Sequence, residues 1–185
     1  MAMRFLRPDD EEQVRSRLAQ ELEGEVDLLL FVQPPTGLYI PGREEPQTGR
    51  ETQRLLEEVA ALSPRLHLSV HNPRTERALA ERYHVERTPA LILRGRPRGG
   101  DGAASDPAAA VGQEQADEQA SPLGAEAGTG GLVRFFGLPA GYEFATLLDD
   151  IVDVSRGRTQ LSAATREAVA ALPGPLHLQV FVTPT

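Results

Sequence analysis

Two histidines, His67 and His71, are the side chains whose type and spacing best suit acid–base chemistry or metal binding. Leu66, Leu68 and Val70 alternate with polar residues around them, which predicts a half-buried strand with both imidazoles on one face. Two imidazoles on one face could bind a metal ion, but the neighbouring sequence offers no third ligand. A solvated strand face is therefore the favoured interpretation, and we predict neither a metal site nor a cofactor.

The other polar residues show none of the spacings that nucleophilic, phosphate-binding or metal-dependent enzymes require. The acidic pairs at 57–58 and 149–150 occupy adjacent positions in predicted helices. Side chains at adjacent helix positions point in different directions, so we expect these carboxylates to be solvated and not to act as a pair. His84 and His177 stand alone in the sequence. There is no Ser-His-Asp order and no glycine-rich phosphate loop. Motifs therefore give no support to a metal- or nucleotide-dependent enzyme.

Composition narrows the chemistry further. The sequence has 185 residues, no cysteine and a net charge of −8. The absence of cysteine excludes disulfide bonds, thiolate metal sites and dithiol chemistry for this chain. The acidic balance argues against a nucleic-acid partner, because phosphate binding needs clustered cations. The one basic run, Arg94, Arg96 and Arg98, reads as a solvated strand end.

No apolar run approaches the roughly 20 residues that span a bilayer, and the first residues show no secretory pattern. We therefore predict a cytoplasmic protein with neither a membrane nor a nucleic acid as partner.

Alternating helical and strand patterns predict an α/β domain with a four-stranded mixed sheet flanked by helices. The expected helices span 8–23, 51–62, 73–83 and 142–156, and the expected strands span 26–32, 66–71, 90–93 and 132–136. Two helix starts carry capping signals. Thr48 and Glu51 have the spacing of a capping box, and Asn72 precedes Pro73 as an N-cap would.

Two further stretches differ from this pattern. Residues 95–131 are dominated by Gly, Ala and polar residues, and they predict a disordered insertion because they cannot bury enough apolar surface. Beyond the last helix, 161–172 reads as a short helix and 176–182 as a strand.

Residues 132–157, which include Phe-Phe-Gly-Leu-Pro-Ala-Gly and Asp-Ile-Val-Asp-Val-Ser, resemble the protein disulfide oxidoreductase family, also called glutaredoxin-like. Residues 82–93 resemble the cis-proline region of that family, and 180–185 resemble the stretch before its second Cys-x-x-Cys. The resemblance covers nearly the whole chain outside 34–43 and 95–131. It implies two fused thioredoxin-fold units, each with a Cys-x-x-Cys pair at a helix N-terminus, where the helix dipole stabilises the thiolate.

The resemblance also implies where a site would lie. The first Cys-x-x-Cys pair aligns with Pro46, Gln47, Thr48 and Gly49, none of which is cysteine. Thr88–Pro89 aligns with the cis-proline that borders the family's site and presents backbone groups to an extended peptide. The strand after Pro89 should run away from that end of the sheet, so we expect the insertion to leave from the opposite end and not to act as a lid.

These observations predict a thioredoxin-like unit over 1–158, interrupted by the 95–131 insertion, and an incomplete second unit over 159–185. The expected function is that of a redox-inactive N-terminal unit, part of a longer protein of thiol–disulfide exchange and redox homeostasis. Its expected partners are protein or peptide clients and a catalytic second unit. The alternative is a stand-alone, non-enzymatic module that binds a peptide or a protein.

Overall fold

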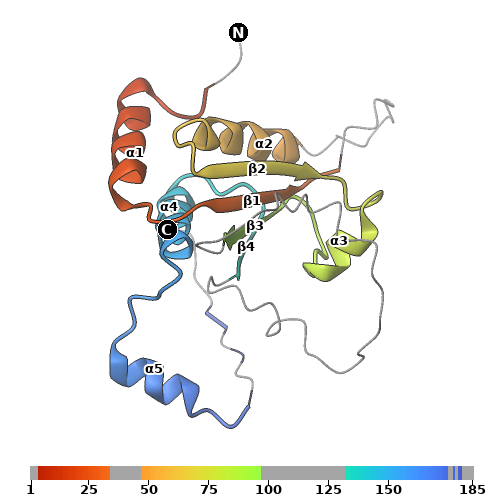
Figure 1. The fold of residues 1–185 in the computed structure, drawn as a ribbon. Helices are drawn as coiled ribbons and strands as arrows, with labels where there is room; N and C mark the ends of the chain where they lie inside the picture. Colours follow the sequence, from red (N-terminus) through yellow and green to blue (C-terminus); the bar gives the residue numbers. More distant parts are fainter. Residues whose placement is uncertain (1–3, 34–46, 97–131, 175–176, 178, 181–185) are drawn as a thin grey trace, which may run out of the picture.

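A four-stranded mixed β-sheet with strand order β2-β1-β3-β4 forms the centre of the structure (Figure 1). The computed structural model describes residues 4–33, 47–96, 132–174, 177 and 179–180. The strands are β1 (Val26–Phe31), β2 (Leu66–His71), β3 (Ala90–Gly95) and β4 (Leu132–Phe136). Strand β1 is parallel to β2 and antiparallel to β3, and β4 is antiparallel to β3. The predicted α/β class and mixed sheet are confirmed.

Helices cover both faces of this sheet. They are α1 (Pro8–Glu21), α2 (Gln47–Ala60), α3 (Arg77–Arg82) and α4 (Tyr142–Arg156), whereas α5 (Ala163–Ala170) lies away from the sheet. Helices α1, α2 and α4 contribute to the larger apolar core on one face, and α3 contributes to a smaller core on the other. Figure 1 shows α2 and α3 on opposite sides of the strands.

Strand β1 is buried along its whole length, including Asp27, the one charged residue among its apolar ones. Leu28 and Leu30 lie in the larger core, whereas Leu29 and Phe31 lie in the smaller one. Both cores therefore depend on the alternation of side chains along one central strand.

Both capping predictions are wrong. Helix α2 begins at Gln47, so Thr48 lies inside it, and the Thr48 carbonyl accepts a hydrogen bond from Thr52 Oγ1 at 2.7 Å. Helix α3 begins at Arg77, because Asn72 forms a turn instead of a cap. The Asn72 side chain accepts from Arg74 N at 3.0 Å.

The insertion was predicted to begin at Gly95, but Gly95 is the last residue of β3. A Cβ at Gly95 would lie 2.7 Å from the Val154 carbonyl oxygen of α4, so glycine permits this close approach of strand and helix. The predicted disorder of 97–131 falls outside the described residues. Directly after the strand, Arg96 N donates to the Glu25 carbonyl at 2.9 Å, at the far end of the sheet from Pro89.

Helix α5 follows α4 after Gly157, which ends α4 with a left-handed φ of 62°. Ser162 caps α5 by accepting from Thr165 N at 3.1 Å, and none of the residues of α5 is buried. The strand predicted over 176–182 is wrong at the residues of this range that the structure describes. Its described residues 177, 179 and 180 have no strand structure, and Val180 is 84% exposed. The division at residue 158 stays a prediction.

Candidate functional site

The Thr88–Pro89 peptide bond is cis, as the sequence resemblance predicted. Pro89 is buried and Thr88 is half-buried. Since Ala90 pairs with Phe31, the bond lies at the end of the sheet where β1 finishes and β3 starts. The Pro89 carbonyl accepts from Gly137 N at 2.9 Å, which connects this segment to the residue after β4. Three strand ends therefore meet around Pro89.

The first turn of α2 lies at the same end of the sheet. A Cβ built on Gly49 would be 3.7 Å from Cγ1 of Val32, the residue directly after β1. Thr48 and Gly49 are both half-buried. Pro46 lies outside the described residues, as does the side chain of Gln47. The structure thus brings the two described positions, Thr48 and Gly49, to the cis-proline end of the sheet.

A cation and an aromatic ring flank the cis bond. The Arg87 guanidinium lies 4.7 Å from the centroid of the Phe136 ring, within the range of cation–π attraction. Phe136 is 37% exposed, so this pair lies at the surface. The sequence interpretation missed the pair, because only the β3–β4 register brings Phe136 opposite Ala90.

An ion-pair network occupies the opposite end of the sheet. The buried Asp27 carboxylate accepts from Arg94 Nη2 at 2.8 Å and from Arg96 Nε at 2.7 Å. Arg94 Nη1 also donates to the Tyr83 hydroxyl at 3.2 Å. Burial alone would lower the pKa of Arg94, but its hydrogen bonds and charge interactions with Asp27 and Tyr83 raise it. The basic run is therefore partly neutralised by Asp27 and is not simply solvated.

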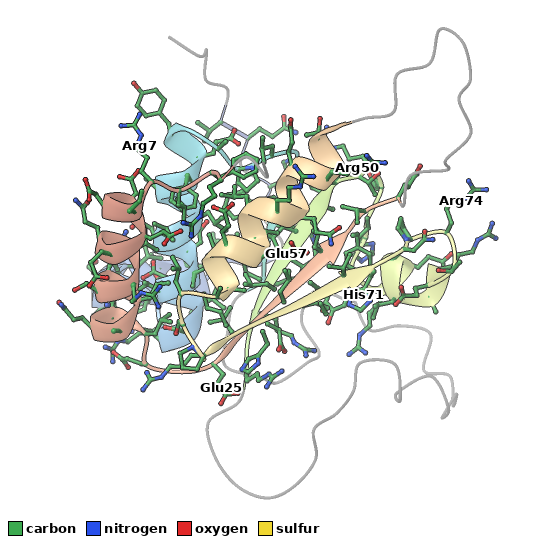
Figure 2. All side chains as sticks on the ribbon, turned by 90° about the horizontal axis from the view of Figure 1, so that it is seen from above. Arg7, Glu25, Arg50, Glu57, His71 and Arg74 are labelled. Atoms are coloured by element: carbon green, nitrogen blue, oxygen red, sulfur yellow. The ribbon has the colours of Figure 1, made fainter. Side chains whose placement is uncertain are left out.

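The prediction that His71 lies on a solvated strand face is wrong. Its side chain is only 10% exposed, and both ring nitrogens have partners. Nδ1 lies 2.6 Å from Glu76 Oε2, and Nε2 lies 2.9 Å from Ser69 Oγ. Burial reverses along β2, because Val70 is 44% exposed while His71 packs 5.3 Å from the Phe31 ring. Figure 2 shows His71 near α3, far along the sheet from Glu25.

His67 lies on the same strand face but at the other end of β2. Its Nε2 is 3.2 Å from Glu25 Oε2, without hydrogen-bond geometry. Within the described ranges, no group of three or more His, Cys, Asp or Glu side chains could hold a metal ion. The two histidines therefore belong to separate local networks.

The linkage of Ser69, His71 and Glu76 was missed in the sequence. Ser69 and His71 are two residues apart on a strand, which could have indicated that they share a face. Glu76 could not be placed, because the helix was predicted to start at Pro73 and the turn after Asn72 was not foreseen.

Among the helices of the described residues, none is long and apolar enough to cross a membrane.

No family model matches this sequence, and no curated protein matches it. Several solved structures match it in fold. A cysteine-to-alanine mutant of the alkylhydroperoxide reductase protein AhpF from Enterococcus faecalis matches with a TM-score of 0.60 and 22% identity, over 92% of this chain and 62% of that one. The N-terminal N/C domain of the same AhpF matches with a TM-score of 0.59 and 22% identity, over 91% of this chain and 62% of that one.

A protein disulfide oxidoreductase from Aeropyrum pernix K1 also matches with a TM-score of 0.59 and 22% identity. The match covers 91% of this chain and 56% of that one. The chain thus spans only 56% to 62% of the length of these structures. It has the thioredoxin-like fold that these structures share.

Proposed function

We propose that this chain is a redox-inactive thioredoxin-like unit of a protein of thiol–disulfide exchange, and that it supports a second unit carrying the dithiol. The observation that carries the proposal is the retained cis-proline end of the sheet in a chain that has no cysteine. Pro89 is buried and hydrogen-bonded to Gly137, and α2 begins beside Val32 at the same end.

The residues at this end of the sheet cannot perform dithiol exchange themselves. That reaction needs a thiolate to attack a disulfide and a second thiol to release the mixed disulfide. Thr48 and Gly49 stand in the first turn of α2, where the helix dipole would stabilise a thiolate, but neither has sulfur. The electrons must therefore come from a dithiol elsewhere.

The same end of the sheet suits recognition of an extended segment. Within the described residues, the backbone N–H and C=O of Thr88 form no hydrogen bond. An extended peptide could pair with these groups, as a strand pairs with a free sheet edge. The neighbouring Arg87 and Phe136 would offer a cation and a ring face to its side chains.

The similarity to a protein named as a disulfide oxidoreductase supports this assignment. The chain spans 56% of that structure, which leaves room there for a further unit of the kind that would carry the dithiol. A role in redox homeostasis and a cytoplasmic location complete the proposal.

The test adds the chain to a thioredoxin-like unit that carries a Cys-x-x-Cys pair and follows the reduction of a disulfide-linked peptide. We expect reduction to be faster than with the dithiol unit alone, and the P89A variant to abolish the gain. The P173A variant changes a proline outside the sheet and should keep it. No gain with the unmodified chain would refute the proposed function. Saturable peptide binding without a gain would favour the stand-alone binding module.

A further inference from the structure

Three side chains around the end of β2 are connected in one line. Ser69 Oγ lies 2.9 Å from His71 Nε2, and His71 Nδ1 lies 2.6 Å from Glu76 Oε2. Both contacts are within hydrogen-bond distance. This is the order of hydroxyl, imidazole and carboxylate in which a histidine can take the proton of a serine.

The carboxylate is held by the turn that follows β2. Its second oxygen, Oε1, accepts from Asn72 N at 2.9 Å, and Glu76 N donates to the Asn72 carbonyl at 2.9 Å. Burial alone would raise the pKa of Glu76, but the hydrogen bonds from His71 and Asn72 outweigh it and lower the pKa. Glu76 is therefore an anion at neutral pH, in a position defined by the backbone.

An anionic carboxylate can only accept a hydrogen bond, so the proton between Glu76 and His71 is on Nδ1. In a neutral imidazole the other nitrogen, Nε2, then has a free lone pair. The hydrogen bond at Nε2 must consequently come from the Ser69 hydroxyl, which makes His71 the acceptor for the serine proton. The Phe31 ring, 5.3 Å from the imidazole, packs against His71 and limits its rotation.

Ser69 also has access to solvent. It is half-buried on β2, which is an edge strand of the sheet. Val26 N donates to Arg65 O, and Val32 N donates to His71 O, so the odd-numbered residues of β2 pair with β1. The N–H and C=O of Val70 therefore point to the outer side of β2, away from β1, next to Ser69.

We propose that Ser69, His71 and Glu76 form a nucleophilic acyl-transfer site for small activated esters. Ser69 Oγ attacks the ester carbonyl carbon while His71 Nε2 takes the hydroxyl proton, and Glu76 stabilises the imidazolium. The carbon–oxygen bond to the leaving alcohol breaks, and His71 returns the proton to that alcohol. Water then attacks the acyl-serine in the same way and releases the acid.

The surroundings of Ser69 restrict the substrate class. Ser69 is half-buried on the α3 face of the sheet, whereas the side chain of the next residue, the 44%-exposed Val70, points to the opposite face and does not contact the substrate. The Val70 N–H can donate to the oxygen that becomes negative during attack. A short acyl group such as acetyl suits this site, because it needs no apolar contact beyond the serine and this N–H group. This site lies on β2 and needs no dithiol partner, so it is independent of the proposed function.

The chain offers a clean background for the test, because its sequence contains neither lysine nor cysteine. The experiment incubates the full chain with p-nitrophenyl acetate, measures release of p-nitrophenol and locates the acetyl group by peptide mass spectrometry. We expect an acetyl group on the peptide with Ser69. S69A should reduce the rate on the order of 100-fold, and E76Q by about tenfold or more. S16A changes an exposed serine of α1 and should leave the rate unchanged.

A second variant keeps the proposal testable if S69A unfolds. S69C places the single thiol of the chain beside His71, and S16C places one on the exposed face of α1. An imidazole partner favours the thiolate, so S69C should react with iodoacetamide at least about tenfold faster than S16C. Equal iodoacetamide rates for S69C and S16C, or acetylation of the wild-type chain away from Ser69, would overturn the proposal. Ser69 and Glu76 would then serve only as hydrogen-bond partners of the buried His71.

Discussion

The two faces of the sheet differ in what their side chains do. On the face covered by α2 and α4, the strands present apolar residues, among them Leu28, Leu30, Leu91 and Leu93. On the α3 face the same strands present Asp27, Arg94, Ser69 and His71, together with a small apolar core. Helix α3 has only six residues, and Ser69 and Arg94 on that face are only half-buried. One face therefore provides stability, and the other positions groups capable of chemistry.

The largest expected effect tests the apolar face. Leu30→Ala removes a fully buried side chain and should lower the free energy of unfolding by about 3 kcal/mol, through lost burial and the cavity left behind. Leu132→Ala removes the same atoms from β4 on the α3 face, where the leucine is 40% exposed, and should cost less than about 1 kcal/mol. Urea unfolding of both variants measures the difference. Similar losses would contradict the division between the faces.

The second prediction concerns the loss of a buried carboxylate on the α3 face that pairs with two arginines. Asp27→Ala leaves Arg94 and Arg96 without their shared carboxylate and should cost about 2 kcal/mol, because both cations are partly shielded from water. Asp149→Asn disrupts an exposed pair with Arg17 and should cost less than about 1 kcal/mol. Unfolding at low and high salt checks this, since salt should weaken only the second effect. If both variants lost the same free energy of unfolding, Asp27 would contribute no more to stability than an exposed surface charge.

The two faces also differ in how well sequence predicts them. Apolar patterns indicated β1 and α4 correctly, because burial of leucine and valine needs only the right period. The cis bond at Pro89 followed from the family resemblance and not from periodicity. The polar face was less predictable. The position of Glu76 depends on the turn at Asn72, and the partners of Asp27 depend on strand register.

The third prediction concerns the pH dependence of the Ser69–His71–Glu76 linkage. The folded-state pKa of Glu76 is below its ordinary value of 4.5, so its stabilising contribution is present above 4.5 and is lost as pH falls through the folded pKa. Because Glu76 is 40% exposed, Glu76→Gln should cost less than about 1 kcal/mol near neutral pH, and the cost should vanish in acid. Urea unfolding across this pH range measures it. The exposed Glu81→Gln variant on α3 serves as the control, and a pH-independent cost for Glu76→Gln would contradict the linkage.

The smallest expected effect concerns a carboxylate beside the apolar face. Asp150 lies in α4 next to the buried Ile151, and burial first, then the charges of Asp153 and Asp149, raise its pKa above 3.8. The folded chain therefore binds this proton more tightly than the unfolded chain, and stability falls as pH rises from 3.8 through the folded pKa.

Asp150→Asn removes that charge, so it should stabilise the chain by a few tenths of a kcal/mol near neutral pH and make little difference in acid. Thermal unfolding at both pH values tests this. Asp27 offers the contrast, because its carboxylate is the more buried of the two and yet has two arginine partners. If Asp150→Asn were destabilising at neutral pH, the charge of Asp150 would have to be stabilised by the fold, as the charge of Asp27 is.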